Sequence, residues 1–208
     1  RLKGKLTKAE KAAWDAALVL RENRKTTAVE LSARILSELS QLDMPRVQFS
    51  CVFTELELTP NGADAVAFYM SANAGDELKP MNKVASGGEL ARIMLAMKNV
   101  LAERDQVNTL IFDEVDTGVS GRAAQKVAEK LRAVAEHKQV LCVTHLPQLA
   151  ALANTHLLIA KSERDGRTYT TVTPLDLEGR NRELARIIGG ANITETTLKS
   201  AEEMLNVT

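Results

Sequence analysis

The first 44 residues contain one glycine and no proline, so little in them interrupts a helix before Pro45. They are rich in Ala, Leu, Glu, Lys and Arg, which favour helix, and Leu31, Ile35 and Leu39 recur at helical spacing. Elsewhere in this stretch the apolar stripe is weak, which is typical of one arm of a helical hairpin or coiled coil. The sequence therefore predicts a coiled-coil-type helix over residues 1–45.

Beyond Pro45 the spacing of apolar residues changes from the helical period to an alternation. Alternate positions are apolar over residues 47–53, a Pro-Asn-Gly turn follows at residues 60–62, and a second β-type run covers residues 65–70. This pattern predicts an antiparallel hairpin.

The remainder of the chain alternates short apolar runs with amphipathic stretches, which predicts a β/α series. Strands are expected at residues 109–112, 140–143, 156–160 and 168–173, and helices at residues 89–103, 122–136, 147–153, 180–188 and 195–205. The predicted fold class is α/β, with a mainly parallel sheet, an N-terminal antiparallel hairpin and a long helix.

The charge balance excludes a global electrostatic attraction to DNA or to a membrane surface. Lys plus Arg and Asp plus Glu are 27 each among 208 residues, so the net charge is zero. Residues 1–25 carry a local excess of five positive charges. A solvated helix face is the ordinary interpretation of that excess, and a local DNA contact is the alternative.

Two further features predict where the protein works. No apolar run approaches the ~20 residues that span a bilayer, and no secretory leader is evident, so a cytoplasmic protein is expected. Cys51 and Cys142 lie in apolar, β-type runs, where a buried free thiol is the default interpretation. The chain begins at Arg1 rather than Met, which suggests a piece of a longer protein.

A serine, two glycines and a glutamate, Ser86 to Glu89, introduce the predicted helix over residues 89–103. Gly87 and Gly88 let backbone amides approach a ligand closely, and the start of a helix presents unpaired N–H groups and the positive end of its dipole. The pattern is typical of a phosphate seat, although an N-capped helix after a loop has it too.

Two predicted strands end in polar side chains: Asp113 and Glu114 follow the first, and Thr144 and His145 follow the second. At the carboxyl ends of strands in an open α/β sheet, one carboxylate can hold Mg²⁺ and another can orient or deprotonate a water. If the strands are parallel neighbours, His145 lies at the same edge as the carboxylates. Each residue alone also has a structural interpretation, as an acidic helix cap or a satisfied histidine.

The order and spacing of these motifs resemble the C-terminal half of an ATP-binding-cassette ATPase head. Residues 86–90 resemble the signature motif, residues 110–114 the Walker B strand, residues 115–121 the D-loop, and His145 the switch histidine. The long helix leading into a hairpin resembles the head-proximal coiled coil of SMC-like proteins.

Within that group, the runs at residues 83–90, 113–121 and 143–148 resemble bacterial DNA-repair members, and the resemblance covers essentially the whole chain. One departure concerns the D-loop, where Ser120 stands at the position of the usual aspartate. No Gly-x-x-x-x-Gly-Lys-Ser/Thr phosphate loop occurs, since Gly4-Lys5 is followed by Leu6. The resemblance implies that this loop lies on an N-terminal half of the same protein.

The resemblance also implies a role for each matched residue. Glu114 is expected to be the general base or water-orienting residue, His145 the γ-phosphate sensor, and Asp113 the Mg²⁺ ligand. ATP contacts are expected from Ser86, Gly87, Gly88, Glu89 and Asp116. The signature residues would meet nucleotide that is held by the second head of a homodimer.

The expected protein is an SMC-like ATPase that uses ATP and Mg²⁺ and tethers DNA ends in recombinational double-strand break repair. Residues 1–45 would be the head-proximal helix and residues 46–208 the C-terminal part of the head, inactive without the phosphate loop. The expected partners are the N-terminal half, a second copy and DNA, with no membrane. Two alternatives stay open: a structural DNA-binding module with a vestigial ATPase, and the ATPase subunit of a transporter, which would not begin with such a helix.

Overall fold

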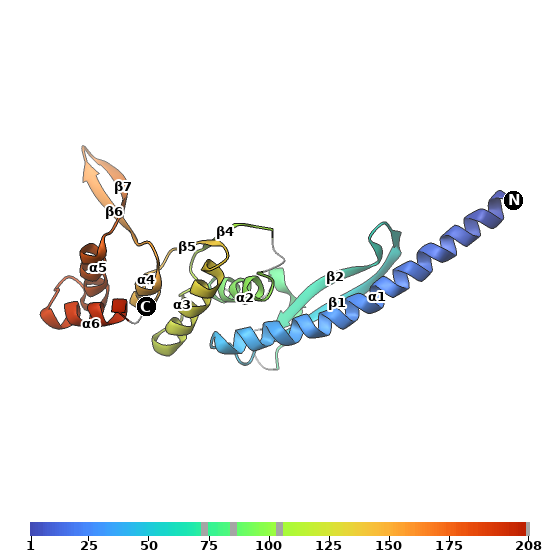
Figure 1. Ribbon diagram of the computed structural model, residues 1–208, viewed down its shortest axis with the longest axis horizontal. Coiled ribbons are helices and arrows are strands. Elements are labelled where there is room, and N and C mark those ends of the chain that lie inside the picture. The colour runs from blue at the N-terminus through green and yellow to red at the C-terminus, as the bar shows by residue number, and fades with distance from the viewer. Residues whose placement is uncertain (72–74, 84–86, 103–105, 207–208) are drawn as a thin grey trace. The chain divides into compact units, whose positions relative to one another are not determined.

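The computed structural model describes residues 1–71, 75–83, 87–102 and 106–206 (Figure 1). These fall into two compact units, the first made of Arg1–Ser86 and Ala96–Leu101, the second of Gly87–Leu95 and Ala102–Thr208. Both units combine helices with strands, which confirms the predicted α/β class. Within the described ranges, no helix is both long enough and apolar enough to span a bilayer. The division predicted at residue 45 stays a prediction.

The first unit is built on α1 (Leu2–Gln41), the long helix that the sequence predicts. It ends just before Pro45, where the N–H of Leu42 donates to the carbonyl of Glu38 (3.1 Å) and Asp43 turns into the left-handed region (φ 62°). A proline cannot continue the helix and disfavours helical backbone in the residue before it, so the end of α1 follows from the sequence.

The predicted hairpin is also present, as part of an antiparallel sheet of order β1-β2-β3. Its strands are β1 (Gln48–Thr59), β2 (Gly62–Ser71) and β3 (Lys79–Pro80), and the 3₁₀ helix η1 (Met81–Lys83) follows them. The Thr59 hydroxyl accepts from the N–H of Asn61 (3.2 Å) and donates to the carbonyl of Gly62 (2.7 Å), which closes the turn. The sequence analysis did not anticipate β3 or η1.

The C-terminal part of α1 carries two of the helix's three buried residues, and Ala17 is the third. Ile35 and Leu39 are fully buried, as is Met70 of β2, and α1 contacts both long strands of the hairpin. The last residues of α2 (Gly87–Val100) join this unit, where Asn99 Nδ2 donates to Glu38 Oε2 (2.6 Å). The core therefore lies where the helix, the hairpin and the end of α2 meet.

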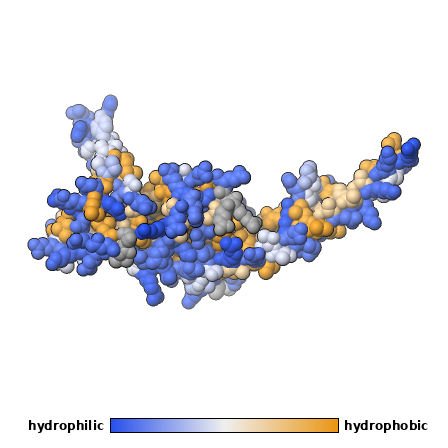
Figure 2. All heavy atoms as spheres, viewed as in Figure 1, coloured by the Kyte–Doolittle hydropathy of each residue, from blue (hydrophilic) through white to orange (hydrophobic). Residues whose placement is uncertain are grey.

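The N-terminal part of α1 leaves apolar side chains in solvent. Figure 2 shows apolar patches between hydrophilic ones along this helix. The exposed members include Leu2, Leu6, Leu18, Val19 and Val29. A helix whose apolar residues are unburied in its own chain is typical of a coiled-coil arm, as predicted.

Arg21 fastens the exposed part of α1 to the hairpin. Its Nε lies 2.6 Å from Asp64 Oδ1, and its Nη1 lies 2.6 Å from Glu55 Oε1. The hydrogen bond to Asp64 raises the pKa of Arg21 above its ordinary value. The Asp64 side chain is only 1% exposed, so its charge depends on this guanidinium for a partner.

The second unit contains the first residues of α2 and a series of shorter elements. These are β4 (Thr109–Phe112), α3 (Gly121–Ala135), β5 (Gln139–Cys142), α4 (Pro147–Leu152), β6 (Leu157–Arg164), β7 (Arg167–Pro174), α5 (Leu177–Gly189) and α6 (Glu195–Asn206).

The strands of this unit form two sheets rather than one β/α series. β4 and β5 pair in parallel, as expected, but they are the only strands of that sheet in the described part of the chain. The strands expected at residues 156–160 and 168–173 are β6 and β7, which pair antiparallel in a separate hairpin. Asp165 (φ 50°) and Gly166 (φ 68°) form its turn, and parallel strands would need a crossover of roughly a dozen residues.

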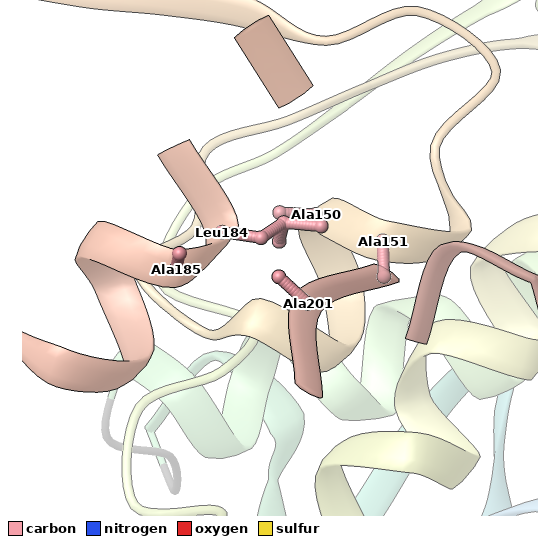
Figure 3. Packing of buried hydrophobic residues seen from close by; sticks show 5 residues of the cluster. All are labelled: Ala150, Ala151, Leu184, Ala185 and Ala201. Carbon is pink, nitrogen blue, oxygen red and sulfur yellow. The ribbon is translucent and has the colours of Figure 1, made fainter. Parts of the chain in front are cut away.

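Small side chains allow the helices of the second unit to pack closely. Ala150 and Ala151 of α4, Leu184 and Ala185 of α5 and Ala201 of α6 form one buried cluster (Figure 3). The buried face of α3 is likewise made of alanine with Val127, Leu131 and Val134, and α3 contacts α4 and β5. These contacts hold α3, which follows β4, and α4, which follows β5, in position.

Replacing Arg21 with methionine is expected to lower the urea midpoint of unfolding clearly, because the buried Asp64 carboxylate then loses its partner while the aliphatic stem is kept. Lys25→Met is the matched control on the same helix, since the Lys25 side chain is half exposed and its ion pair is with Glu22. Circular dichroism during urea titration measures both. Equal midpoints for the two variants would show that Arg21 does not anchor α1.

Candidate functional site

The register of β4 and β5 determines what meets at the edge of their sheet. Phe112 and Cys142, the last residue of each strand, are paired, and the N–H of Val143 donates to the carbonyl of Phe112 (3.0 Å). The segments after both strands therefore leave the sheet at the same edge. This brings the segment with the two predicted carboxylates beside the one with the predicted histidine, as expected for parallel neighbours.

Asp113 and Glu114 are exposed at this edge. A carboxylate at the end of a strand suits Mg²⁺, which proteins usually hold through one or two carboxylates while phosphate and water oxygens complete the shell. Among the described residues no group of three or more His, Cys, Asp or Glu side chains could hold a metal ion alone, so the Mg²⁺ contact of Asp113 stays a prediction.

The backbone at Glu114 is strained. Its φ of 59° lies in the left-handed region, which costs a residue with a side chain on the order of 1–3 kcal/mol. The turn that holds it is closed by the N–H of Thr117, which donates to the carbonyl of Glu114 (3.0 Å), and it is anchored by the fully buried Val115. Strain that the surrounding structure holds in place is typical of functional sites.

The start of α2 packs against this same turn. A side chain at Gly87 would collide with the carboxylate of Glu114, and a Cβ at Gly88 would lie 2.8 Å from Thr117 Cβ and 2.9 Å from the Thr117 carbonyl oxygen. At Gly88 a side chain is therefore excluded unless the turn moves, whereas at Gly87 it would displace the end of the exposed Glu114 side chain. Gly88 thus has a packing role in this structure in addition to the ATP contact predicted for it.

The other predicted signature residues are placed less fully. Ser86 lies outside the described residues, and Glu89 is half-buried in the first turn of α2, where the helix dipole favours a negative charge. Arg92 was not singled out from the sequence. It is 8% exposed, and its Nη1 donates to the Thr117 carbonyl (2.7 Å). The sequence did contain one signal for this residue, a positively charged side chain within the apolar face of the helix, one turn after Gly88.

Asp116 is buried rather than exposed, and it joins the turn that follows β4 to the turn that follows β5. It is 3% exposed, and its Oδ2 accepts from Thr144 Oγ1 (2.5 Å) and from the backbone N–H of His145 (3.1 Å). The Nδ1 atom of His145 lies 3.2 Å from the same oxygen, while the His145 side chain is 76% exposed. The contact between Asp116 and ATP stays a prediction.

The two cysteines are free, and both are half-buried. Burial raises the pKa of the Cys142 thiol to about 12, with smaller contributions from the negative charges of Asp116 and Asp113. Cys142 is therefore protonated near neutral pH and serves as an apolar strand residue rather than a nucleophile.

No protein-family profile matches the chain, but curated proteins named DNA repair protein RecN do. The Bacillus subtilis protein is 46% identical over 198 residues, which cover 88% of this chain and 34% of the relative. The Vibrio cholerae protein is 44% identical over 192 residues, 91% of this chain and 35% of the relative. The Rickettsia conorii protein is 38% identical over 206 residues, 99% of this chain and 38% of the relative. The chain thus spans about a third of the length of these relatives.

Solved structures of SMC head domains resemble the chain in fold. The Smc head domain with a coiled coil and joint from Pyrococcus yayanosii has a TM-score of 0.52 at 22% identity, covering 77% of this chain and 29% of that one. The Smc head domain from Pyrococcus furiosus, bound to the C-terminal domain of ScpA, has a TM-score of 0.53 at 22% identity, covering 79% and 39%. This likeness confirms the predicted head-type fold.

Gly88→Ala is expected to destabilise the protein by about 1–3 kcal/mol, since the added methyl group overpacks the contact between α2 and the Thr117 turn. Gly4→Ala is the control, because Gly4 lies in α1 with no atom within 4 Å of the added Cβ and alanine favours helix by up to about 1 kcal/mol. Urea unfolding gives both free energies. A Gly88→Ala protein as stable as wild type would contradict the close packing.

Proposed function

This chain is a relative of the DNA repair protein RecN over most of its length, and from that relationship we propose that it forms the C-terminal part of an SMC-like ATPase head that acts in DNA repair. The observation that supports this most strongly is the edge of the β4–β5 sheet. There, the segment with Asp113 and Glu114 and the segment with His145 leave the sheet side by side, although about thirty residues separate them in sequence.

In the proposed reaction each side chain has one task. Glu114 orients and deprotonates the attacking water, Asp113 holds Mg²⁺, and His145 contacts the γ-phosphate. The exposure of all three supports these roles, because a nucleotide can reach them from solvent. Mg²⁺ would supply neutralisation of the charge on the β- and γ-phosphates.

The phosphate loop is proposed to come from the N-terminal half of the same protein. The outward face of the β4–β5 sheet is apolar and uncovered, with Ile111 71%, Leu141 42% and Val143 52% exposed. Parallel sheets are normally covered on both faces, so this surface suits a further layer of the same head. An N-terminal half that extends the sheet would cover it.

The residues at the start of α2 are proposed to act across a homodimer, on ATP held by the other head. The first turn of a helix leaves N–H groups without intrahelical partners and carries the positive end of the helix dipole, which supports an anion contact. Ser86, Gly87 and Gly88 would form this contact, with Glu89 beside them, while Asp116 belongs to the neighbouring D-loop.

DNA ends at double-strand breaks are the proposed partner of the whole protein, in the cytoplasm and at the nucleoid. The net charge of zero restricts any DNA contact to a local surface. Arg21 and Lys25 of the basic stretch are engaged in ion pairs, so the exposed cations of the first turns of α1 are the proposed contact: Arg1, Lys3, Lys5, Lys8 and Lys11.

Glu114→Gln, in this chain joined to its N-terminal half, is expected to keep ATP binding and to lower turnover by about 10²–10⁴-fold, because the amide cannot accept the proton of the attacking water. Phosphate release with and without linear DNA measures this. Glu163→Gln is the control, an exposed glutamate in the β6–β7 hairpin.

Equal turnover in the Glu114→Gln and Glu163→Gln proteins would remove Glu114 from the proposed role. If wild type and both variants bind DNA but none of the three hydrolyses ATP, the result would instead favour a structural module with a vestigial ATPase.

A further inference from the structure

The Asp116 carboxylate is a buried polar group that joins the segment after β4 to the segment after β5. One oxygen, Oδ2, accepts hydrogen bonds from the Thr144 hydroxyl (2.5 Å) and from the backbone N–H of His145 (3.1 Å), and the His145 ring nitrogen Nδ1 lies 3.2 Å from it. A buried carboxylate is costly unless donors satisfy it, and here the donors come from the segment that follows β5. Asp116 itself comes from the segment that follows β4.

The contact to Nδ1 determines which nitrogen of the imidazole ring carries the proton. A carboxylate oxygen accepts and does not donate, so the nitrogen facing it carries the proton. The other nitrogen, Nε2, is then available to a ligand, as an acceptor in the neutral ring and as a donor in the charged ring. Because the His145 side chain is 76% exposed, a bound nucleotide can reach that nitrogen.

The Thr144 hydroxyl extends this arrangement to the backbone. It donates to Asp116 and accepts from the N–H of Leu146 (3.0 Å), so the turn that carries His145 is held on both sides of the histidine. These bonds hold the backbone that carries the ring, with Nδ1 on the side of Asp116.

We propose that Asp116 is a positioning residue, which fixes the tautomer and orientation of His145 and ties that histidine to the turn of Glu114. This role rests on the proposed function, in which His145 contacts the γ-phosphate. It differs from a direct contact between Asp116 and ATP, because a carboxylate that is 3% exposed acts through the histidine.

The kinetic test is a double-mutant cycle in this chain joined to its N-terminal half. Asp116→Asn is expected to lower kcat for ATP hydrolysis about 10- to 100-fold, as loss of a group that orients a functional histidine typically does, with little change in KM. In the His145→Ala background the same substitution is expected to cost less than about 2-fold, because its effect passes through the ring. Asp64→Asn is the matched control, a buried carboxylate that pairs with Arg21.

The kinetic outcomes separate this inference from the proposed function. An equal loss from Asp116→Asn with and without His145 would overturn the positioning role, as would a kcat matching that of Asp64→Asn. Wild-type turnover in the His145→Ala protein would instead overturn the proposed role of His145 in hydrolysis.

The tautomer can be measured without relying on a variant that folds less well. In the wild-type protein with ¹⁵N-labelled histidine, the His145 ring is expected to carry its proton on Nδ1 when neutral, its signals being assigned by their loss in His145→Gln. An Nε2–H ring in the wild type would overturn the proposal regardless of the kinetics. Loss of the Nδ1–H preference in Asp116→Asn, with no change in Asp64→Asn, would support it.

Discussion

The parallel pairing of β4 with β5 is the interaction on which the candidate site depends. Phe112 and Cys142 end two paired strands although about thirty residues separate them in sequence, so the segments that follow start side by side. A shift of one residue in that register would turn the buried Leu110 and Phe112 outward and displace the carboxylates from the histidine. The helix α3, buried along one face, is the crossover that makes the parallel arrangement possible.

The turn after β4 concentrates features that are individually unfavourable. Glu114 is held in the left-handed region, Asp116 carries its carboxylate into the interior, and Gly88 of α2 is packed too closely for any side chain. Two contacts hold the turn in this conformation. The N–H of Thr117 closes it, and Arg92 donates to the Thr117 carbonyl. Features that lower stability are thus concentrated in one short segment beside exposed carboxylates. Such a concentration is typical of functional sites.

Periodicity and composition were enough to predict α1, the β1–β2 hairpin and the strands β4 and β5, because those signals are local. The β6–β7 hairpin was placed in a β/α series although Asp165-Gly166 is a two-residue turn signal, so there a local cue was available and outweighed. The burial of Asp116 was different. It depends on the register between strands far apart in the chain, and no local pattern shows that Thr144 and His145 will supply its donors. Residue identity supplied the candidate members of the site, and tertiary pairing decided how they are arranged.

Two surfaces remain uncovered for related physical reasons. A parallel sheet of two strands buries Leu110 and Phe112 on one face and presents Ile111 and Leu141 on the other, whereas parallel sheets are ordinarily covered on both faces. A helix of 40 residues that buries only Ala17, Ile35 and Leu39 likewise presents most of its length to solvent. Covering the sheet requires further strands and helices, and covering the arm requires another helix. An ATPase head with a coiled coil would contain such elements, so the exposed surfaces agree with the proposed function.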